Sequence, residues 1–179
     1  MKKIKKGHIV LISLILLIIL IYAIYPKKNF IYVDYVENNT VINVINNEEI
    51  DFILQHSLNE YNVKGYTVIV RKLNSKLYYM HDGYAMSGTV YPINDNTFQI
   101  LIRDDLSTAS YIEVITHEVI HIKQYINNRL MLIEPGVVQF DNKVYELEEL
   151  NYQNRPWERE AFIEGLILSE KIQKILYVK

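Results

Sequence analysis

The longest apolar run of this chain lies at its start. Residues 9 to 24 are almost all aliphatic, and with His8 and Tyr25 included the run spans about 18 residues. Lysines flank the run on both sides, namely Lys2, Lys3, Lys5, Lys6, Lys27 and Lys28. A run of this length that is apolar all round and flanked by lysines predicts a transmembrane helix in residues 1 to 25.

The lysine distribution around this run predicts its orientation. Four lysines and the amino terminus precede it and two lysines follow it, so the chain is expected to start in the cytoplasm. Residues 26 to 179 would then lie outside the membrane. The alternative is a cleaved signal peptide with Ala23 before the cut and a secreted domain. We favour the uncleaved anchor because the run is long and Ile21 suits such a cut poorly.

The first half of the remaining chain predicts one helix among several strands. Residues 26 to 179 are about 150 residues, the size of a single domain. A helix is expected to begin at Asn46 or Asn47, with acids in its first turn, and to end before Gly65. Strands are predicted at residues 30 to 36, 66 to 72, 77 to 81, 84 to 91 and 97 to 103.

The second half predicts two helices separated by a short hairpin. Ser110 and Glu113 have the spacing of a capping box, which predicts a helix from about residue 110 to 127. A hairpin is expected over residues 137 to 147, turning at Asp141 and Asn142. Pro156 suits a first helical turn and predicts a last helix that runs towards Leu176. The pattern as a whole predicts an α+β domain.

The first of these two helices carries the pentapeptide His117-Glu118-Val119-Ile120-His121. Residues four apart lie one above the other on a helix, so both imidazoles can bind one metal ion. Glu118 is rotated by about 100° from His117, beside the metal, where a base can take a proton from a bound water. Random placement would give this pattern in roughly 1 in 100 such chains, so a third ligand is needed to support it.

Glu158 on the last helix is the candidate third ligand. Helical geometry places it at the centre of an apolar face, where a carboxylate needs a partner. Ala161 and Gly165 lie on the same face and would let two helices approach closely. The alternative partner of Glu158 is an arginine such as Arg103 or Arg129. Glu160 is the fallback ligand, although its neighbours predict a solvated face.

These segments resemble the small gluzincin-type zinc metallopeptidases, including several bacterial and phage-encoded ones. The resemblance rests on the pentapeptide, on the Lys123-Gln124-Tyr125 that follows it, and on residues 155 to 161, Arg-Pro-Trp-Glu-Arg-Glu-Ala. It implies a zincin-like fold, with a mixed sheet packed beside the active-site helix. It also implies a His117, His121 and Glu158 site for Zn²⁺, completed by a glutamate from a second helix.

Three protein ligands would leave one tetrahedral position of Zn²⁺ open, as in catalytic sites. Glu118 would then act as the general base in the hydrolysis of a peptide or protein substrate. The substrate is expected to add to an edge strand formed by residues 97 to 103. Tyr145 and Tyr152 are candidates for stabilising the oxyanion. The alternative function is a membrane-anchored interaction protein that binds zinc without turnover, although zinc binding alone would not require Glu118.

The composition excludes other kinds of site. The formal charge of −2 gives no indication of a nucleic-acid partner, and the absence of cysteine excludes disulfides and thiolate ligands. His8, His56 and His81 lack ligand-like spacing. A structural zinc site would need a fourth protein ligand, for which no residue stands out.

Overall fold

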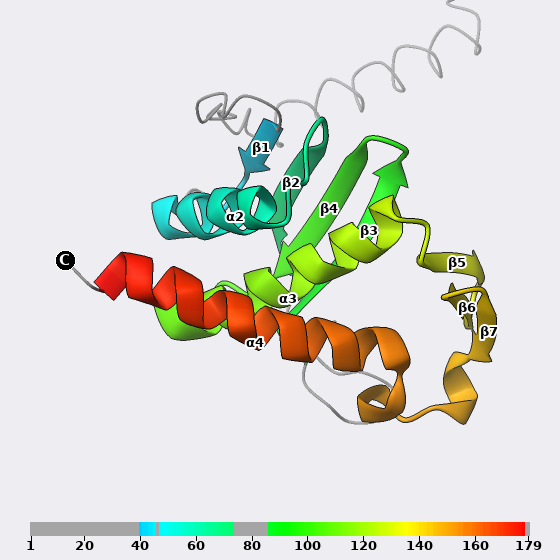
Figure 1. Cartoon of the computed structure of the whole chain (residues 1–179). Helices are drawn as coiled ribbons and strands as arrows, with labels where there is room; N and C mark the ends of the chain where they lie inside the picture. The colour runs from blue at the N-terminus through cyan, green and yellow to red at the C-terminus, as the bar shows by residue number, and fades with distance from the viewer. Residues whose placement is uncertain (1–39, 46, 74–85, 178–179) are drawn as a thin grey trace, which may run out of the picture. The chain divides into compact units, whose positions relative to one another are not determined.

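The computed structural model describes residues 40–45, 47–73 and 86–177 (Figure 1). The expected anchor in residues 1 to 25 and the strands at 30 to 36 and 77 to 81 lie outside the described residues, as do His8 and His81. Within the described ranges, none of the helices combines the length and the apolar character needed to cross a bilayer.

A mixed four-stranded sheet forms the framework of the described part. It consists of β1 (Thr40–Asn43), β2 (Thr67–Lys72), β4 (Thr97–Ile102) and β3 (Gly88–Asn94), in that spatial order. β1, β2 and β4 are parallel, and β3 is antiparallel to β4. The expectation that residues 97 to 103 form an edge strand is therefore wrong. β4 is hydrogen-bonded on both sides, and β3 beyond it is the edge strand among the strands of the described ranges.

Three α-helices complete the framework within the described residues. They are α2 (Glu48–Glu60), α3 (Thr108–Ile126) and α4 (Pro156–Tyr177). The Asn47 side chain caps α2 by accepting from the Glu49 amide, as the sequence predicted. α4 begins at Pro156, also as predicted.

The predicted capping box of α3 is wrong. The cap residue lies three residues earlier than expected, because Ser107 has extended backbone angles and its hydroxyl accepts from the Ser110 amide. Ser110 therefore lies inside the first turn. Both serines fit a cap by type, and the backbone decides between them, since a cap residue must be extended.

α3 occupies the centre of the domain. It contacts β3 and β4 of the sheet, and α2 and α4 pack against it (Figure 1). Its predicted apolar face is buried in the main hydrophobic core, which includes Tyr111, Ile112, Ile115, Val119 and Ile122. The α+β class with a mixed sheet beside this helix is confirmed.

A small antiparallel sheet holds the start of α4. It consists of β5 (Leu130–Glu134), β6 (Val137–Phe140) and β7 (Lys143–Glu146). The predicted turn at Asp141 and Asn142 is present, and both residues have positive φ angles, as a two-residue hairpin turn requires. Trp157 packs against Phe140 and Tyr145 of this sheet, with ring centroids 6.1 and 5.6 Å apart. This contact fixes the first turn of α4, which carries Glu158.

Candidate metal centre

The site lies where α3 and α4 cross at close range. A Cβ atom added to Gly165 would stand 3.2 Å from both the Cα and the backbone nitrogen of His117. Few residues other than glycine fit such a contact, because it is tighter than ordinary Cβ packing. Ala161, one turn earlier on α4, is fully buried. The predicted role of Gly165 in helix approach is confirmed, and Ala161 is buried on the same face.

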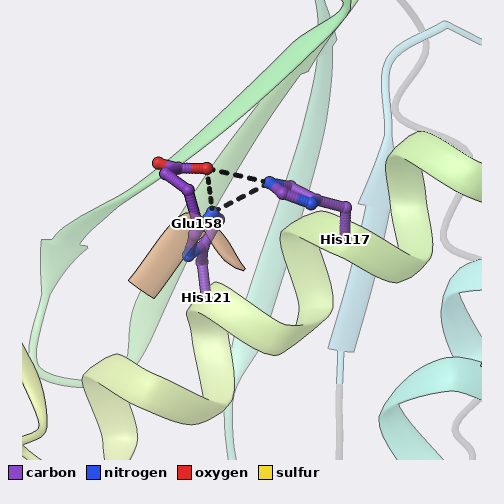
Figure 2. A group of neighbouring side chains, drawn as sticks. All are labelled: His117, His121 and Glu158. Atoms are coloured by element: carbon purple, nitrogen blue, oxygen red, sulfur yellow. Dashed lines mark hydrogen bonds and ion pairs between the residues drawn. The ribbon is translucent and has the colours of Figure 1, made fainter. Parts of the chain in front are cut away.

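Three nitrogen and oxygen atoms converge at this crossing. His117 Nε2 lies 3.0 Å from His121 Nε2, and Glu158 Oε2 lies 3.2 and 3.3 Å from these two nitrogens. Figure 2 shows both imidazoles rising from α3 and the Glu158 carboxylate facing them. In a tetrahedral zinc site with bonds of about 2.0–2.1 Å, neighbouring ligand atoms are roughly 3.3 Å apart. The three atoms therefore have the spacing of one face of such a tetrahedron.

Glu158 lies at the edge of the buried face of α4. The sequence placed it at the centre of an apolar face, which Phe162 and Leu166, four and eight residues further along the helix, would share. In the structure these two residues are 62% and 42% exposed, while Gly165 and Leu168 are buried. The central placement was wrong because the buried face of α4 is rotated towards α3. Glu158 itself keeps 13% of its side chain exposed, so a ligand can reach it.

The other candidate partners and ligands are engaged elsewhere. Arg129 forms two hydrogen bonds to Glu160, both 2.7 Å, and two more to Asp141. Arg103 pairs with Asp105. The partners of the Glu158 carboxylate are thus the two histidines, and neither of the two arginines considered as alternatives. Glu160, the fallback ligand, instead faces the guanidinium group of Arg129.

Gln124 fixes the orientation of the His121 ring. Its Nε2 donates to the Trp157 carbonyl oxygen at 3.1 Å and to Glu160 at 3.3 Å. Because the amide nitrogen faces these acceptors, Oε1 faces His121 Nδ1 at 2.8 Å and accepts its proton. The Nε2 atom of His121 is then directed at Glu158 and is the nitrogen available to a metal. Such outer partners commonly orient metal-binding histidines.

In the metal-free chain, the charges of Glu158 and His121 stabilise each other. Burial alone would raise the pKa of Glu158, but hydrogen bonds from His117 and His121 outweigh it and hold the pKa well below its usual range. Burial would lower the pKa of His121, yet its hydrogen bond to Glu158 and the charges of Glu158 and Glu118 raise that pKa to about 9. The site therefore holds a carboxylate beside an imidazolium, whose proton a metal ion can replace.

Glu118 lies next to the three converging side chains but is not one of the converging groups. It is 4% exposed, and burial raises the pKa of its carboxyl group. The Val90 amide of β3 donates a hydrogen bond to this carboxylate. Gly88 leaves the space for it, because a Cβ there would stand 2.5 Å from Val114 and 3.3 Å from Glu118 Oε1. The edge strand thus positions Glu118.

A cavity of about 600 Å³ opens onto the site. Its walls come from the start of β3, from α3, from the turn before α4 and from α4 itself. They are formed by Met86, Ser87, Gly88, Glu113, Val114, His117, Glu118, Tyr152, Gln153, Glu158, Arg159, Phe162 and Ile163. Tyr152 hydrogen-bonds to Glu158. Burial is the main cause that raises the pKa of the Tyr152 phenol, and the charge of the Glu158 carboxylate raises it further. Tyr145, the other oxyanion candidate, packs on Trp157 and does not line the cavity.

All four residues singled out in the sequence meet here: His117, His121 and Glu158 converge and Glu118 lies beside them. The sequence reasoning missed the roles of Gln124, of the Val90 amide and of Gly88. The three-residue spacing from His121 to Gln124 on one helix was the available signal for the first. In the comparisons with known proteins, no family model, curated protein or solved structure matches this chain.

Proposed function

We propose that this chain is a zinc-dependent peptidase of the gluzincin type with a zincin-like domain. The convergence of His117, His121 and Glu158 at tetrahedral spacing, with Glu118 beside them, carries the proposal. The donors suit zinc, which takes imidazole nitrogen and carboxylate oxygen ligands. The cavity gives a substrate access to His117, Glu118 and Glu158.

Each residue has a distinct role in this proposal. His117, His121 and Glu158 hold the zinc ion, and Gln124 orients His121. A zinc ion bound there would supply a Lewis acid that acidifies a water molecule and polarises a carbonyl group. Glu118 takes the proton of the attacking water and returns it to the leaving amine. The burial of Glu118 favours this exchange, since its carboxyl group accepts a proton more readily than an exposed one.

The proposed substrate is a peptide or protein segment in extended conformation. β3 offers the edge for it: β4 is its one strand partner among the described residues, and its first residue lines the cavity. Main-chain hydrogen bonds to β3 would align the substrate with Glu118, which β3 itself positions. This replaces residues 97 to 103 as the docking strand.

The proposed location follows from the lysine-flanked run at the chain start. Residues 1 to 25 would anchor the protein with its amino terminus in the cytoplasm and the peptidase domain outside. Cleavage after Ala23 would instead release the domain as a secreted enzyme. Mass spectrometry of the mature amino terminus distinguishes the two.

The test of the function is zinc content together with peptidase activity of the full chain. We expect about one zinc per chain and hydrolysis of a fluorogenic casein substrate. Glu118→Gln should keep the zinc and lose hydrolysis, whereas His117→Ala should lose both. His56→Ala is the matched control, because His56 lies on α2 and bonds to the Phe52 carbonyl away from the site.

The rival function, zinc binding without turnover, gives a different result. The wild-type chain would then hold zinc, and its casein hydrolysis would equal that of Glu118→Gln. A wild-type chain that binds no zinc would refute both functions.

A further inference from the structure

α4 carries an apolar surface that lies outside the hydrophobic core. Phe162, Ile163, Leu166 and Ile167 are 62%, 56%, 42% and 56% exposed. None of them belongs to a buried cluster of the described residues. The other three residues follow Phe162 by one, four and five positions, which places all four on one side of the helix. We call this side the outer face of α4. Four large apolar side chains gathered on one exposed face are typical of a binding surface.

The outer face continues the wall of the catalytic cavity. Phe162 and Ile163 line the cavity that also holds Glu118 and Glu158. Phe162 follows Glu158 by four residues, so it lies about one helical turn along the same side. Leu166 and Ile167 extend the surface by one further turn. A molecule that reaches the site therefore meets this face next.

The wall of the cavity is mainly apolar, with a few polar groups. Met86 and Val114 lie in its wall together with Phe162 and Ile163. The charged residues outside the proposed zinc and base set are one acid and one base, Glu113 and Arg159. Their opposite charges give no preference for a charged ligand. Apolar walls beside a few polar groups favour an apolar side chain attached to a polar backbone.

We propose that the outer face of α4 binds two alternate apolar side chains of an extended substrate, next to the bond that is cleaved. This inference rests on the proposed peptidase function. Alternate side chains of an extended chain are about 6.6–6.8 Å apart, close to the 5.4 Å rise of one helical turn. One side chain would contact Phe162 and Ile163, and the side chain two residues along would contact Leu166 and Ile167. The enzyme would thus prefer substrates with the pattern apolar, any residue, apolar.

A lipid surface is the competing occupant of such a face. Interfacial helices usually carry many lysines and arginines beside their apolar face. In α4, Arg159 is the one basic residue before Lys171. Glu160 and Glu164, which flank the outer face, are already paired with Arg129 and Lys123. This charge balance disfavours an anionic bilayer and favours a peptide.

Binding of defined peptides tests the inference. The full chain in nanodiscs, carrying Glu118→Gln and loaded with zinc, is titrated with a labelled octapeptide that has leucines two residues apart. Replacing either leucine by serine should weaken binding about tenfold or more. Phe162→Ser with Ile163→Ser should cause a similar loss. Leu166→Ser with Ile167→Ser should remove the preference for the second leucine alone.

A matched control comes from β5. Leu132 and Ile133 are 63% and 52% exposed but lie on the small sheet outside the cavity wall. Leu132→Ser with Ile133→Ser should leave peptide binding unchanged. Equal affinity for the leucine and serine peptides, or an equal loss in the β5 control, would overturn the inference.

Two further measurements separate the possible failures. The outer-face variants should keep one zinc per chain. If the peptide preference is absent although the wild-type chain binds zinc and hydrolyses casein, this inference alone is refuted. A wild-type chain without zinc would refute the proposed function itself. Because the chain has no cysteine, Ile163→Cys can carry a single fluorophore. Its emission should shift to the blue on adding the peptide, whereas quenching by brominated nanodisc lipids would place the face in the bilayer and overturn the inference.

Discussion

Two glutamates of α4 lie two residues apart and have opposite surroundings. Glu158 faces the Nε2 atoms of His117 and His121 at 3.2 and 3.3 Å. Glu160 faces the guanidinium group of Arg129 at 2.7 Å. Both are partly buried, with 13% and 21% of the side chain exposed. Residue type and burial are therefore similar, and the partner makes the difference.

The partners differ in what they can exchange. An imidazole nitrogen can release its proton and bind a metal ion, whereas arginine stays protonated and offers no lone pair. The Glu158 region can therefore become a metal centre, while the Glu160 region holds helix and hairpin together. Gln124 links the regions, since its amide contacts His121 on one side and Glu160 on the other.

The strongest test of this contrast is removal of the Glu158 charge. Zinc binding at four-ligand sites is worth about 10–16 kcal/mol, or about 2.5–4 kcal/mol per ligand, so Glu158→Gln should weaken zinc binding about a hundredfold to a thousandfold. Competition with a chromogenic chelator measures the loss. Glu170→Gln, an exposed acid of the same helix, should bind zinc like the wild type. Unchanged zinc affinity in Glu158→Gln would remove Glu158 from the site.

Substitution of Gln124, which links the Glu158 and Glu160 regions, should have the next largest effect on zinc affinity. Gln124→Leu removes the acceptor of the His121 Nδ1 proton, so the ring loses its orientation. Zinc affinity should fall about tenfold to a hundredfold, as for other outer partners of metal-binding histidines. Gln55→Leu on α2 is the control for the same change of side chain. An unaltered zinc affinity in Gln124→Leu would show that packing alone orients His121.

The sequence predicted the elements of this contrast better than their environment. Local signals sufficed where they decide the structure: Asn47 caps α2, Pro156 starts α4, and Asp141 with Asn142 turns the hairpin. Helical spacing also predicted that His117 and His121 share one face of α3. Glu158 was added because a carboxylate on an apolar face needs a partner and because of the resemblance to gluzincins, and the three side chains do converge.

Tertiary packing decided what the sequence did not predict. The rotation of α4 exposes Phe162 and Leu166, so amphipathicity misplaced Glu158 at the centre of a buried face. The edge position of residues 97 to 103 was likewise wrong, and Phe98, Gln99 and Ile100 are buried in succession, as in strands covered on both sides. The partner of Glu160 was missed because Arg129 lies 31 residues away in sequence.

The pH dependence of zinc binding probes the proton that the metal replaces. Hydrogen bonding to Glu158 and the nearby carboxylate charges raise the pKa of His121 from 6.5 to about 9 in the metal-free chain, against the effect of burial. Below pH 9 zinc must displace a proton, so its apparent affinity should rise about tenfold per pH unit between pH 7 and 9 and then level off.

Proton release in weakly buffered solution gives the matching measurement, with about one proton per zinc expected at pH 7. The stability of the metal-free fold changes with pH in the opposite direction to the zinc affinity. A raised pKa stabilises the metal-free fold most below pH 6.5, and this contribution is lost as the pH rises through 9. A zinc affinity that does not change between pH 7 and 9 would contradict the protonated state of His121.

The smallest effect is expected at Glu160. Glu160→Gln removes one of the two carboxylates around Arg129, but Asp141 keeps its bonds of 2.7 and 2.8 Å to the same guanidinium group. Gln124 also keeps the Trp157 carbonyl as an acceptor. The unfolding free energy should fall by about 1 kcal/mol and zinc affinity by less than about threefold. Asp141→Asn weakens the hydrogen bonds on the exposed side of Arg129 and is the control for stability. If Glu160→Gln lowered zinc affinity as much as Glu158→Gln, the two carboxylates would share one function, and the distinction by partner would be lost.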